Sequence, residues 1–284
     1  MVSFTLSYKG ALADNNVLDM YDAARGLMGF QRSLALTTHL ALNGEIITHA
    51  TALRGATIIS STPEEGSWKV TAVVIAGLYA SVTAPKETPF GHLVYSIYDY
   101  VVNATLGFHV DYNQSLAQQY ENQLQKNKIT EEKLDSLMEK TEYAISDMHR
   151  PIVASESATE AKINANFEIG LPKRVGPTLS RLTYDYVATT VRRDEETEIE
   201  GVVSSFNMNT YKGRIFSFSE QRPIPFELSE TARSRGALLL VTTSLRANAS
   251  NRFDRSAGVV MTVRRFETST GRLKSLIVHD VKNI

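Results

Sequence analysis

The most apolar uninterrupted stretch of the chain runs from Gly66 to Tyr112, and it constrains the fold more than any other segment. It contains Trp68, the single tryptophan, and no charged side chain occurs between Val70 and Pro85. Burying apolar surface is favourable by roughly 25 cal/mol for each Å² removed from water. We therefore expect this stretch to be buried in a protein core, in a subunit interface or in a membrane.

The charge-free part of this stretch is short for a membrane span. Residues 70–85 fall short of the ~20 apolar residues that a spanning helix needs. The second part, Phe90–Leu106, has apolar residues at helical spacing but also contains His92 and Asp99, and a charge within lipid is costly unless it is paired. The sequence favours a buried strand and helix of a soluble domain. The alternative is a membrane-acting effector in which residues 70–106 enter lipid upon activation.

Length and composition favour a soluble protein of two domains. With 284 residues, the chain exceeds the usual size of a domain with a single core. Its hydrophobic fraction of 43% and charged fraction of 21% are those of an ordinary globular protein. The chain has no cysteine, which excludes disulfides, thiolate metal sites and a cysteine nucleophile, and we expect a cytoplasmic location. The first residues lack the pattern of a signal peptide.

Charge is distributed unevenly along the chain. From Arg174 to the end there are 17 Lys and Arg residues against 12 Asp and Glu residues, and 14 of the 17 are arginines. The part before Arg174 carries 13 basic and 19 acidic residues. Such asymmetry supports a division into two domains and indicates an anionic partner for the second domain. The alternative is that the arginines are scattered over the surface without a binding role.

The first part of the chain shows the patterns of strands and long helices. Alternation of apolar and polar residues predicts strands, and apolar residues at helical spacing predict amphipathic helices. The expected strands are Val2–Tyr8, Glu45–His49, Ala56–Ser60 and Trp68–Ile75. The expected helices are Leu18–Asn43, Phe90–Leu106, one that begins at Ser115 and one that begins at Thr130 and ends near Arg150. We expect an α/β domain of residues 1–169, with long helices packed on a small sheet.

The segment GLPKRVGP contains two glycines and two prolines, and we interpret residues 170–176 as a linker. Patterns of short strands separated by turns follow it. The expected strands are Leu182–Val191, Glu198–Asn207, Arg214–Glu220, Ile224–Leu228, Ala237–Arg246, Val259–Glu267 and Leu273–Val281. Short antiparallel strands in about 110 residues predict a small β-barrel of the OB or SH3-like kind over residues 177–284. The chain as a whole is therefore expected to have an α+β fold.

Motifs that mark catalytic or metal sites do not occur in the sequence. The six histidines form no HExxH motif or other close ligand pair. The GxSxG, P-loop and GxGxxG patterns do not occur either. We therefore expect a non-enzymatic protein without a cofactor or a metal ion. The alternative is an enzyme whose site is assembled from scattered residues.

The apolar stretch offers a candidate surface for self-association. Its small glycine and alanine residues permit close packing between subunits, and its apolar side chains need a partner. The residues expected to form this assembly surface are Trp68, Leu93, Val94, Ile97 and Val101. If they do, we expect a homo-oligomer.

The second part of the chain places arginines beside aromatic residues, which is the combination that phosphate neutralisation and base stacking require. Arg214, for example, alternates with Phe216 along one expected strand. The residues expected to bind a partner, either a protein or a nucleic acid, are Tyr211, Lys212, Arg214, Arg222, Arg264 and Arg265. The alternative is that the phenylalanines face inward as the core of the barrel while the arginines point to solvent.

Four stretches resemble those of a known family. They are TPEEGSWKVTAVV, APKETPFGHLVYSIYDYVVNATLGFHVDY, DMHRPIV and GVVSSFNMNTYKGRIFSF. Together they resemble an uncharacterised bacterial two-domain family, in which both domains are of unknown function. The resemblance covers nearly the whole chain and implies a bacterial or prophage origin, a division near residue 170 and an association with phage defence, but no catalytic residues. We therefore expect a self-assembling protein whose second domain binds a partner or nucleic acid.

Overall fold

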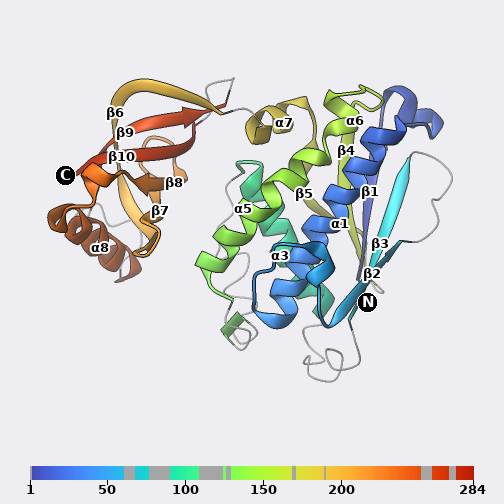
Figure 1. Cartoon of the computed structure of the whole chain (residues 1–284), viewed down its shortest axis with the longest axis horizontal. Helices are drawn as coiled ribbons and strands as arrows, with labels where there is room; N and C mark the ends of the chain where they lie inside the picture. The colour runs from blue at the N-terminus through green and yellow to red at the C-terminus, as the bar shows by residue number, and fades with distance from the viewer. Residues whose placement is uncertain are drawn as a thin grey trace. The chain divides into compact units, whose positions relative to one another are not determined.

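The computed structural model describes residues 2–60, 68–76, 90–108, 124–125, 129–167, 171–188, 190–250, 258–268 and 273–284 (Figure 1). The chain divides into two compact units, Met1–Ala188 and Thr189–Ile284, which we call unit 1 and unit 2. Both units contain helices and strands, which confirms the expected α+β class. The helix expected from Ser115 and the middle of the apolar stretch, residues 77–89, lie outside the described residues.

Unit 1 is built on a five-stranded sheet. Its strands are β1 (Val2–Lys9), β2 (Ala56–Ser60), β3 (Lys69–Ala76), β4 (Glu160–Phe167) and β5 (Lys173–Leu179). Their order is β2-β3-β1-β4-β5, and all neighbours are antiparallel. The helical elements are η1 (Ala11–Asn15), α1 (Met20–Asn43), η2 (Ala50–Ala52), α3 (Phe90–Thr105), α5 (Glu131–Asp147), α6 (Arg150–Val153) and α7 (Arg181–Ala188). Because α1 joins β1 to β2 and the later helices join β3 to β4, the first four strands have the split β-α-β arrangement.

The two faces of this sheet differ, because successive side chains of a strand point to opposite sides. On the central strand β1, Phe4, Leu6 and Tyr8 are fully buried on the side of the helices. Tyr98 of α3 packs edge-on against Phe4, with the ring centroids 5.5 Å apart. On the opposite face, β1 carries Thr5 and other polar side chains. We call this opposite face the open face of the sheet.

The ends of α1 follow local chemistry. Asp19 accepts a hydrogen bond from the backbone N–H of Asp22 (2.9 Å) and so caps the first turn. Gly44 ends the helix in the left-handed conformation, with φ at 65°. Within the helix, a side chain at Gly29 would overlap the backbone carbonyl of Ala144 on α5, so only glycine permits this close approach. The helix expected over Leu18–Asn43 is thus confirmed.

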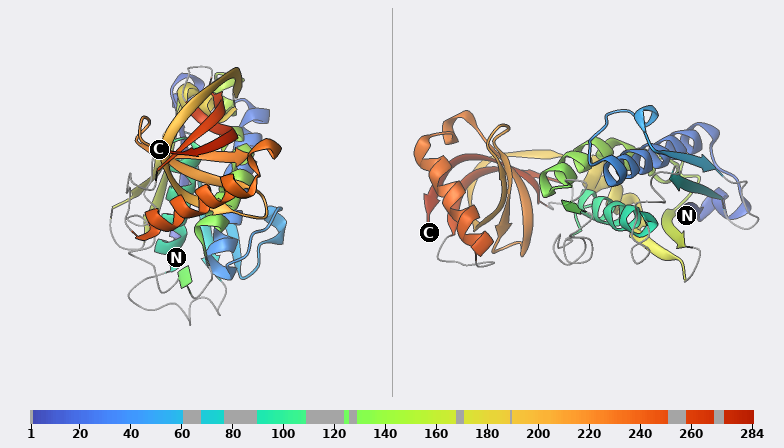
Figure 2. Two further views of the ribbon diagram at one scale, coloured as in Figure 1. Left: turned by 90° about the vertical axis from the view of Figure 1, so that its left-hand side faces the viewer. Right: turned by 90° about the horizontal axis from the view of Figure 1, so that it is seen from below.

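Unit 2 is a closed ring of five strands. They are β6 (Val191–Asn207), β7 (Lys212–Ser217), β8 (Arg222–Leu228), β9 (Val259–Glu267) and β10 (Leu273–Asn283), in the order β10-β8-β7-β6-β9. The ring closes because β10 pairs with both β8 and β9. Two helical elements lie between β8 and β9 in the sequence, η4 (Glu230–Ala232) and α8 (Arg235–Ser250), and Figure 2 shows α8 in orange along the ring.

Helix α8 is held on the ring by packing and by hydrogen bonds to a strand. Strand β9 pairs with β6 only as far as Gly201, so the backbone of Val203 lies beyond that ladder. Ser244 Oγ accepts from the N–H of Val203 (3.0 Å), and Asn248 Nδ2 donates to its carbonyl (3.1 Å). The buried residues of α8 recur at helical spacing: Ala237, Val241, Ser244 and Asn248. The helix therefore replaces a missing strand partner.

One pair of strands departs from the wholly antiparallel ring that we expected. Strands β8 and β10 are parallel, with Phe226 opposite Leu276. Parallel neighbours need a crossover connection, because the chain must return to the same end of the sheet before the second strand begins. Here η4, α8 and β9 form that connection.

Three expected strands are wrong. Residues 182–191 and 237–246 fall largely in α7 and α8, and residues 45–49 form no strand. Short apolar runs do not distinguish a strand from a buried helix, and the spacing of the buried positions decides. In α7 these positions are Thr183, Tyr186 and Val187, which recur at three and four residues as in a helix. The expected strands of unit 2 other than these two are confirmed in position.

The division between the units lies after Ala188 and not at residues 170–176. Residues 173–179 form the edge strand β5, in which Val175 and Leu179 are fully buried. An edge strand tolerates proline and glycine because only one of its sides pairs. Gly176 adopts a left-handed conformation, with φ at 63°. Gly176, which we interpreted as part of a linker, and the following Pro177 therefore belong to an irregular edge strand.

Candidate functional site

The residues expected to form an assembly surface are buried inside unit 1. Leu93 is 4% exposed, and three further side chains of the same helix face are fully buried: Val94, Ile97 and Val101. Trp68 is partly buried against the same core, with its ring 5.6 Å from that of a tyrosine on β1. These side chains already have partners within their own unit, so the expected surface is not available to a second copy. The amphipathic face of α3 serves the domain core.

Neither a membrane-spanning helix nor a metal site is found among the described residues. No helix there combines the length and the apolar character that crossing a membrane requires. Nor do three or more His, Cys, Asp or Glu side chains of the described ranges gather closely enough to hold a metal ion.

His149 is a buried histidine with a structural role. Its Nδ1 atom donates to the carbonyl of Ile145 (2.8 Å), which leaves Nε2 of the neutral ring to accept from the hydroxyl of Thr183 (2.9 Å). Burial lowers the pKa of His149 to about 4. The neutral ring therefore joins the end of α5 to α7. Because it is fully buried, it has no access to a substrate.

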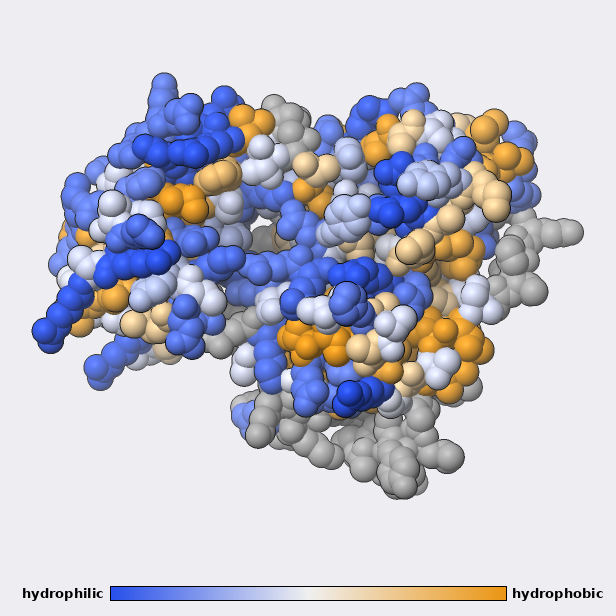
Figure 3. All heavy atoms as spheres, in the orientation of Figure 1, coloured by the Kyte–Doolittle hydropathy of each residue, from blue (hydrophilic) through white to orange (hydrophobic). Residues whose placement is uncertain are grey.

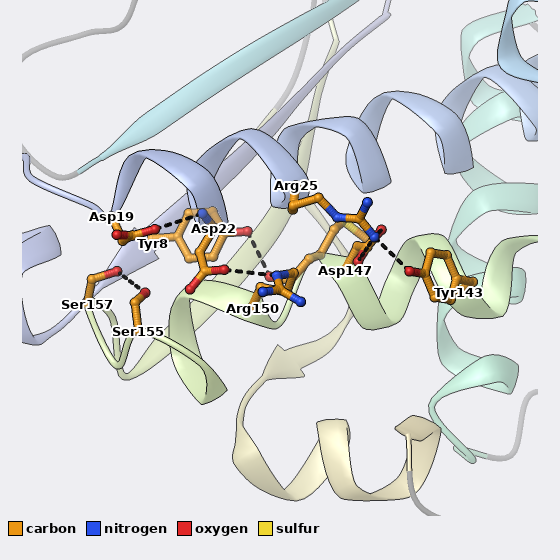
Figure 4. A network of polar contacts seen from close by, with 10 residues as sticks. Tyr8, Asp19, Asp22, Arg25, Tyr143, Asp147, Arg150, Ser155 and Ser157 are labelled. Carbon is orange, nitrogen blue, oxygen red and sulfur yellow. Dashed lines mark hydrogen bonds and ion pairs between the residues drawn. The ribbon is translucent and has the colours of Figure 1, made fainter.

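Unit 1 also contains a network of ion pairs that the sequence analysis did not find (Figure 4). Arg150 Nε donates to Asp22 Oδ1 (2.9 Å), and Arg25 Nη2 pairs with Asp147 (3.0 Å). Arg25 also donates to the hydroxyl of Tyr143 (2.7 Å). In each of the two segments an aspartate is followed three residues later by an arginine: Asp22 and Arg25 in one, Asp147 and Arg150 in the other. This reciprocal spacing could have predicted the pairing. The network clamps α1 onto α5 and α6, so we assign it a structural role.

Two of the residues expected to bind a partner lie on the outer face of β7. Successive side chains of a strand point to opposite faces. Ile215 is fully buried inside the ring, so Lys212 and Arg214 point outward. Phe216 follows on the same outer face and is only half-buried, so it is not part of the ring's core. We call Lys212, Arg214 and Phe216 the β7 strip. It combines two cations with one aromatic ring.

The neighbourhood of the β7 strip is formed by β8 and by the turn that precedes β7. Two prolines of β8 lie opposite Arg214 and Phe216. Tyr211 immediately precedes the strand, and the guanidinium group of Arg233 lies over its ring at 4.4 Å. On the face of unit 2 that Figure 3 shows, hydrophilic residues predominate. Tyr211 thus lies next to the strip, and its ring is already covered by an arginine.

The remaining arginines of the expected set pair with carboxylates. Arg265 lies 3.1 Å from Glu267 and 3.4 Å from Glu220, and Glu220 also lies 3.6 Å from Arg222. Arg264 pairs with a glutamate of β6 at 3.2 Å. The positive charge of these arginines is therefore largely compensated within unit 2. The glutamates that pair with these arginines could not be predicted from the sequence, because pairing across strands is not visible in the order of the residues.

Comparison with family models agrees with the division into two units. A model described as a domain of unknown function, DUF7946, matches residues 4–187. The chain belongs to this family. A model described as a family of unknown function, DUF7947, matches residues 195–282, so the DUF7946 region coincides with unit 1 and the DUF7947 region lies within unit 2. The resemblance to a family with two domains of unknown function is confirmed. No curated protein and no solved structure matches the chain.

Proposed function

We propose that unit 2 binds single-stranded nucleic acid on the outer face of β7 and β8. The observation that carries this proposal is the β7 strip, in which Lys212, Arg214 and Phe216 share one face of a strand. A single nucleic-acid strand offers phosphates, which cations neutralise, and exposed base faces, on which aromatic rings stack. The strip supplies both kinds of contact side by side.

The connectivity of the ring supports this proposal, because it resembles that of an OB-type barrel. The first strand of unit 2 pairs with the second and the fourth, and the third and fifth strands are parallel neighbours. The helix α8 precedes the fourth strand. OB barrels are five-stranded and bind oligonucleotides on the face of their second and third strands. In unit 2 these strands are β7 and β8, which carry the strip.

The charges beside the strip also favour an anionic ligand. Glu227 is the only acidic residue of β8, and it lies opposite Lys212. Arg233 lies 3.9 Å from Glu227 and so offsets its charge. The proposal retains the nucleic-acid partner expected from the sequence. It leaves out self-association through the apolar stretch, because those residues are buried.

Binding of the full chain to a fluorescein-labelled oligonucleotide tests the proposal. The oligonucleotide has about 12 nucleotides, within the 4–16 that an OB fold covers, and is used as DNA and as RNA. Fluorescence anisotropy is measured over a series of salt concentrations. We expect affinity to fall as salt rises, because each neutralised phosphate releases counterions. The double variant Lys212→Ala with Arg214→Ala should reduce the slope of log affinity against log salt by about 1.4, or about 0.7 for each lost contact.

Two further variants separate stacking from charge and from folding. Phe216→Leu keeps apolar volume but removes the ring, and it should weaken binding by about 5- to 150-fold if the ring stacks on a base. Arg246→Ala removes the same charge as Arg214→Ala from the exposed side of α8, and it should leave binding unchanged. Circular dichroism confirms that each variant is folded. Failure of the wild-type chain to bind at low salt, or an equal loss in Arg246→Ala, contradicts the proposal and favours a protein partner.

A further inference from the structure

The open face of the unit 1 sheet is polar on β1 and β4, and on β3 it carries Lys69 and Thr71 beside Val73 and Ile75. The residues of β1 on this face alternate with the buried ones: Ser3, Thr5, Ser7 and Lys9. The hydroxyl oxygens of Thr5 and Thr71 lie 2.9 Å apart, so β1 and β3 present hydroxyl groups to the same side. Asn166 Nδ2 of β4 donates to Thr5 Oγ1 (3.2 Å). The centre of the open face is therefore lined by hydroxyl and amide groups.

One row across these strands places a buried hydroxyl between two lysines. Ser7 lies opposite Lys69 of β3 on one side and opposite Lys162 of β4 on the other. Ser7 is 7% exposed, and its Oγ atom has no hydrogen-bond partner among the described residues. Buried polar atoms in native proteins nearly always have a partner, so an orphaned hydroxyl points to a bound group.

Among the described residues on this face of β1, β3 and β4, lysines outnumber acidic side chains. Lys162 Nζ lies 2.8 Å from Glu160, and Lys9 lies opposite the same glutamate. Glu160 is therefore the carboxylate next to Lys162 and Lys9, whereas Lys69 lies on the far side of Ser7, on β3. The Cα atoms of Lys69 and Lys162 are two strand spacings apart, about 10 Å, so both flexible side chains can reach a single anion above Ser7.

We propose that the row Lys69–Ser7–Lys162 binds a phosphate group. Two ammonium groups and one hydroxyl can donate the charge-assisted hydrogen bonds that phosphate oxygens accept. The described residues on the open face of β1, β3 and β4 include no aromatic side chain, so the row recognises phosphate and not a base. A phosphodiester and a free phosphate share this chemistry. The site does not rest on the function proposed for unit 2.

An NMR titration of the ¹⁵N-labelled full chain tests this site. Sodium phosphate should shift the amide signals of Ser7, Lys69 and Lys162 until they saturate, whereas sodium chloride at equal ionic strength should not. The double variant Lys69→Gln with Lys162→Gln should weaken phosphate binding by about tenfold or more, because hydrogen bonds to charged groups are the strong ones. Lys140→Gln on α5 removes the same charge on the helix side of the sheet and should leave phosphate binding unchanged.

The hydroxyl is tested separately by Ser7→Ala. This variant should weaken phosphate binding by about two- to tenfold, while the midpoint of unfolding stays the same or rises, because a buried hydroxyl without a partner is removed. A purely structural serine would instead lower the midpoint. Equal shifts with phosphate and chloride, or unchanged phosphate binding in the double lysine variant, would overturn the site.

A second titration identifies the source of the phosphate. It uses a single-stranded oligonucleotide and a chain that carries Arg214→Ala and Phe216→Leu, so that the face proposed for unit 2 is disabled. Shifts at Ser7 and Lys69 in this chain assign the site to a phosphodiester backbone. Shifts with inorganic phosphate alone assign it to a free phosphate or a monoester. Either result supports the site whether or not unit 2 binds nucleic acid.

Discussion

His149 should make the stability of unit 1 depend on pH. In the folded state its pKa is lowered to about 4, because the ring is buried and its charged form would lose hydration. In the unfolded chain a histidine has a pKa of about 6.5. Between these two values the unfolded state binds more protons than the folded state does. Stability is therefore full above about pH 6.5 and is lost as the pH falls toward 4.

The magnitude follows from the two pKa values of His149. They differ by about 2.5 units, and each unit corresponds to about 1.36 kcal/mol, so the full loss is about 3.4 kcal/mol. At pH 5 the loss relative to pH 8 is about 2 kcal/mol, because the unfolded ring is then mostly charged. The loss comes from burying charge and not from a broken hydrogen bond. Thr183 Oγ1 can accept from a protonated Nε2 as well as donate to a neutral one.

Urea unfolding followed by tryptophan fluorescence measures this effect in unit 1 alone. Trp68 is the only tryptophan of the chain, and it packs against the core of unit 1. The free energy of unfolding is determined at pH 8 and at pH 5 for the wild type and for His149→Gln, which cannot take up a proton. The variant should be less stable at pH 8, because glutamine does not reproduce both hydrogen bonds. Its difference between the two pH values should be smaller by about 2 kcal/mol.

A control and an opposing group complete the experiment. His49→Gln changes an exposed histidine and should keep the full pH dependence. Burial raises the pKa of Asp99, so this carboxyl acts in the opposite direction as the pH falls, but equally in the wild type and in both variants. If His149→Gln retains the wild-type difference between pH 8 and pH 5, the assignment to His149 is refuted.

Two further predictions concern the clamp of unit 1 and the helix of unit 2. Arg150→Ala should destabilise unit 1 by about 2 kcal/mol in the same fluorescence assay, because Asp22 is left buried without its cation; full retention of stability would contradict this. This loss of stability is smaller than that expected for a fully buried ion pair, because Arg150 is one-third exposed. Ser244→Ala should speed hydrogen exchange at the amide of Val203 and cost unit 2 about 1–3 kcal/mol, whereas Ser250→Ala should change neither.

The elements whose ends are set by nearby residues were predictable from the sequence. The alternation from Val2 to Tyr8 predicted β1, and Thr130 caps α5 as its sequence context indicated, by accepting from the N–H of Lys133. Such signals depend on a few consecutive residues, so they do not depend on contacts with distant parts of the chain. The apolar run of α8 was different, because its β-branched residues favour a strand. Its helical state follows from Ser244 and Asn248 meeting a strand far away in the sequence.

The candidate site was predictable only in part. Arginines and aromatics could be found in the sequence, but the face on which each lies depends on strand register. Arg214 and Phe216 lie together on the outside of β7, whereas Arg265 is bound by the carboxylates of Glu220 and Glu267. The row around Ser7 was not foreseen either, since its three members come from three strands. Strand register determines which residues lie side by side, and it is not apparent from their order in the chain.

The central position of β1 governs when unit 1 can fold during synthesis. This strand is made before the other strands of its sheet, yet it pairs with β3 and with β4, where Val2 lies opposite Phe167. A nascent chain that ends before β4 therefore holds β1 with one side unpaired, a condition in which strands tend to associate with other chains. Closing so long a loop also makes the sheet slow to complete. Nearly all of unit 1 must therefore be synthesised before β1 is paired on both sides and protected from aggregation.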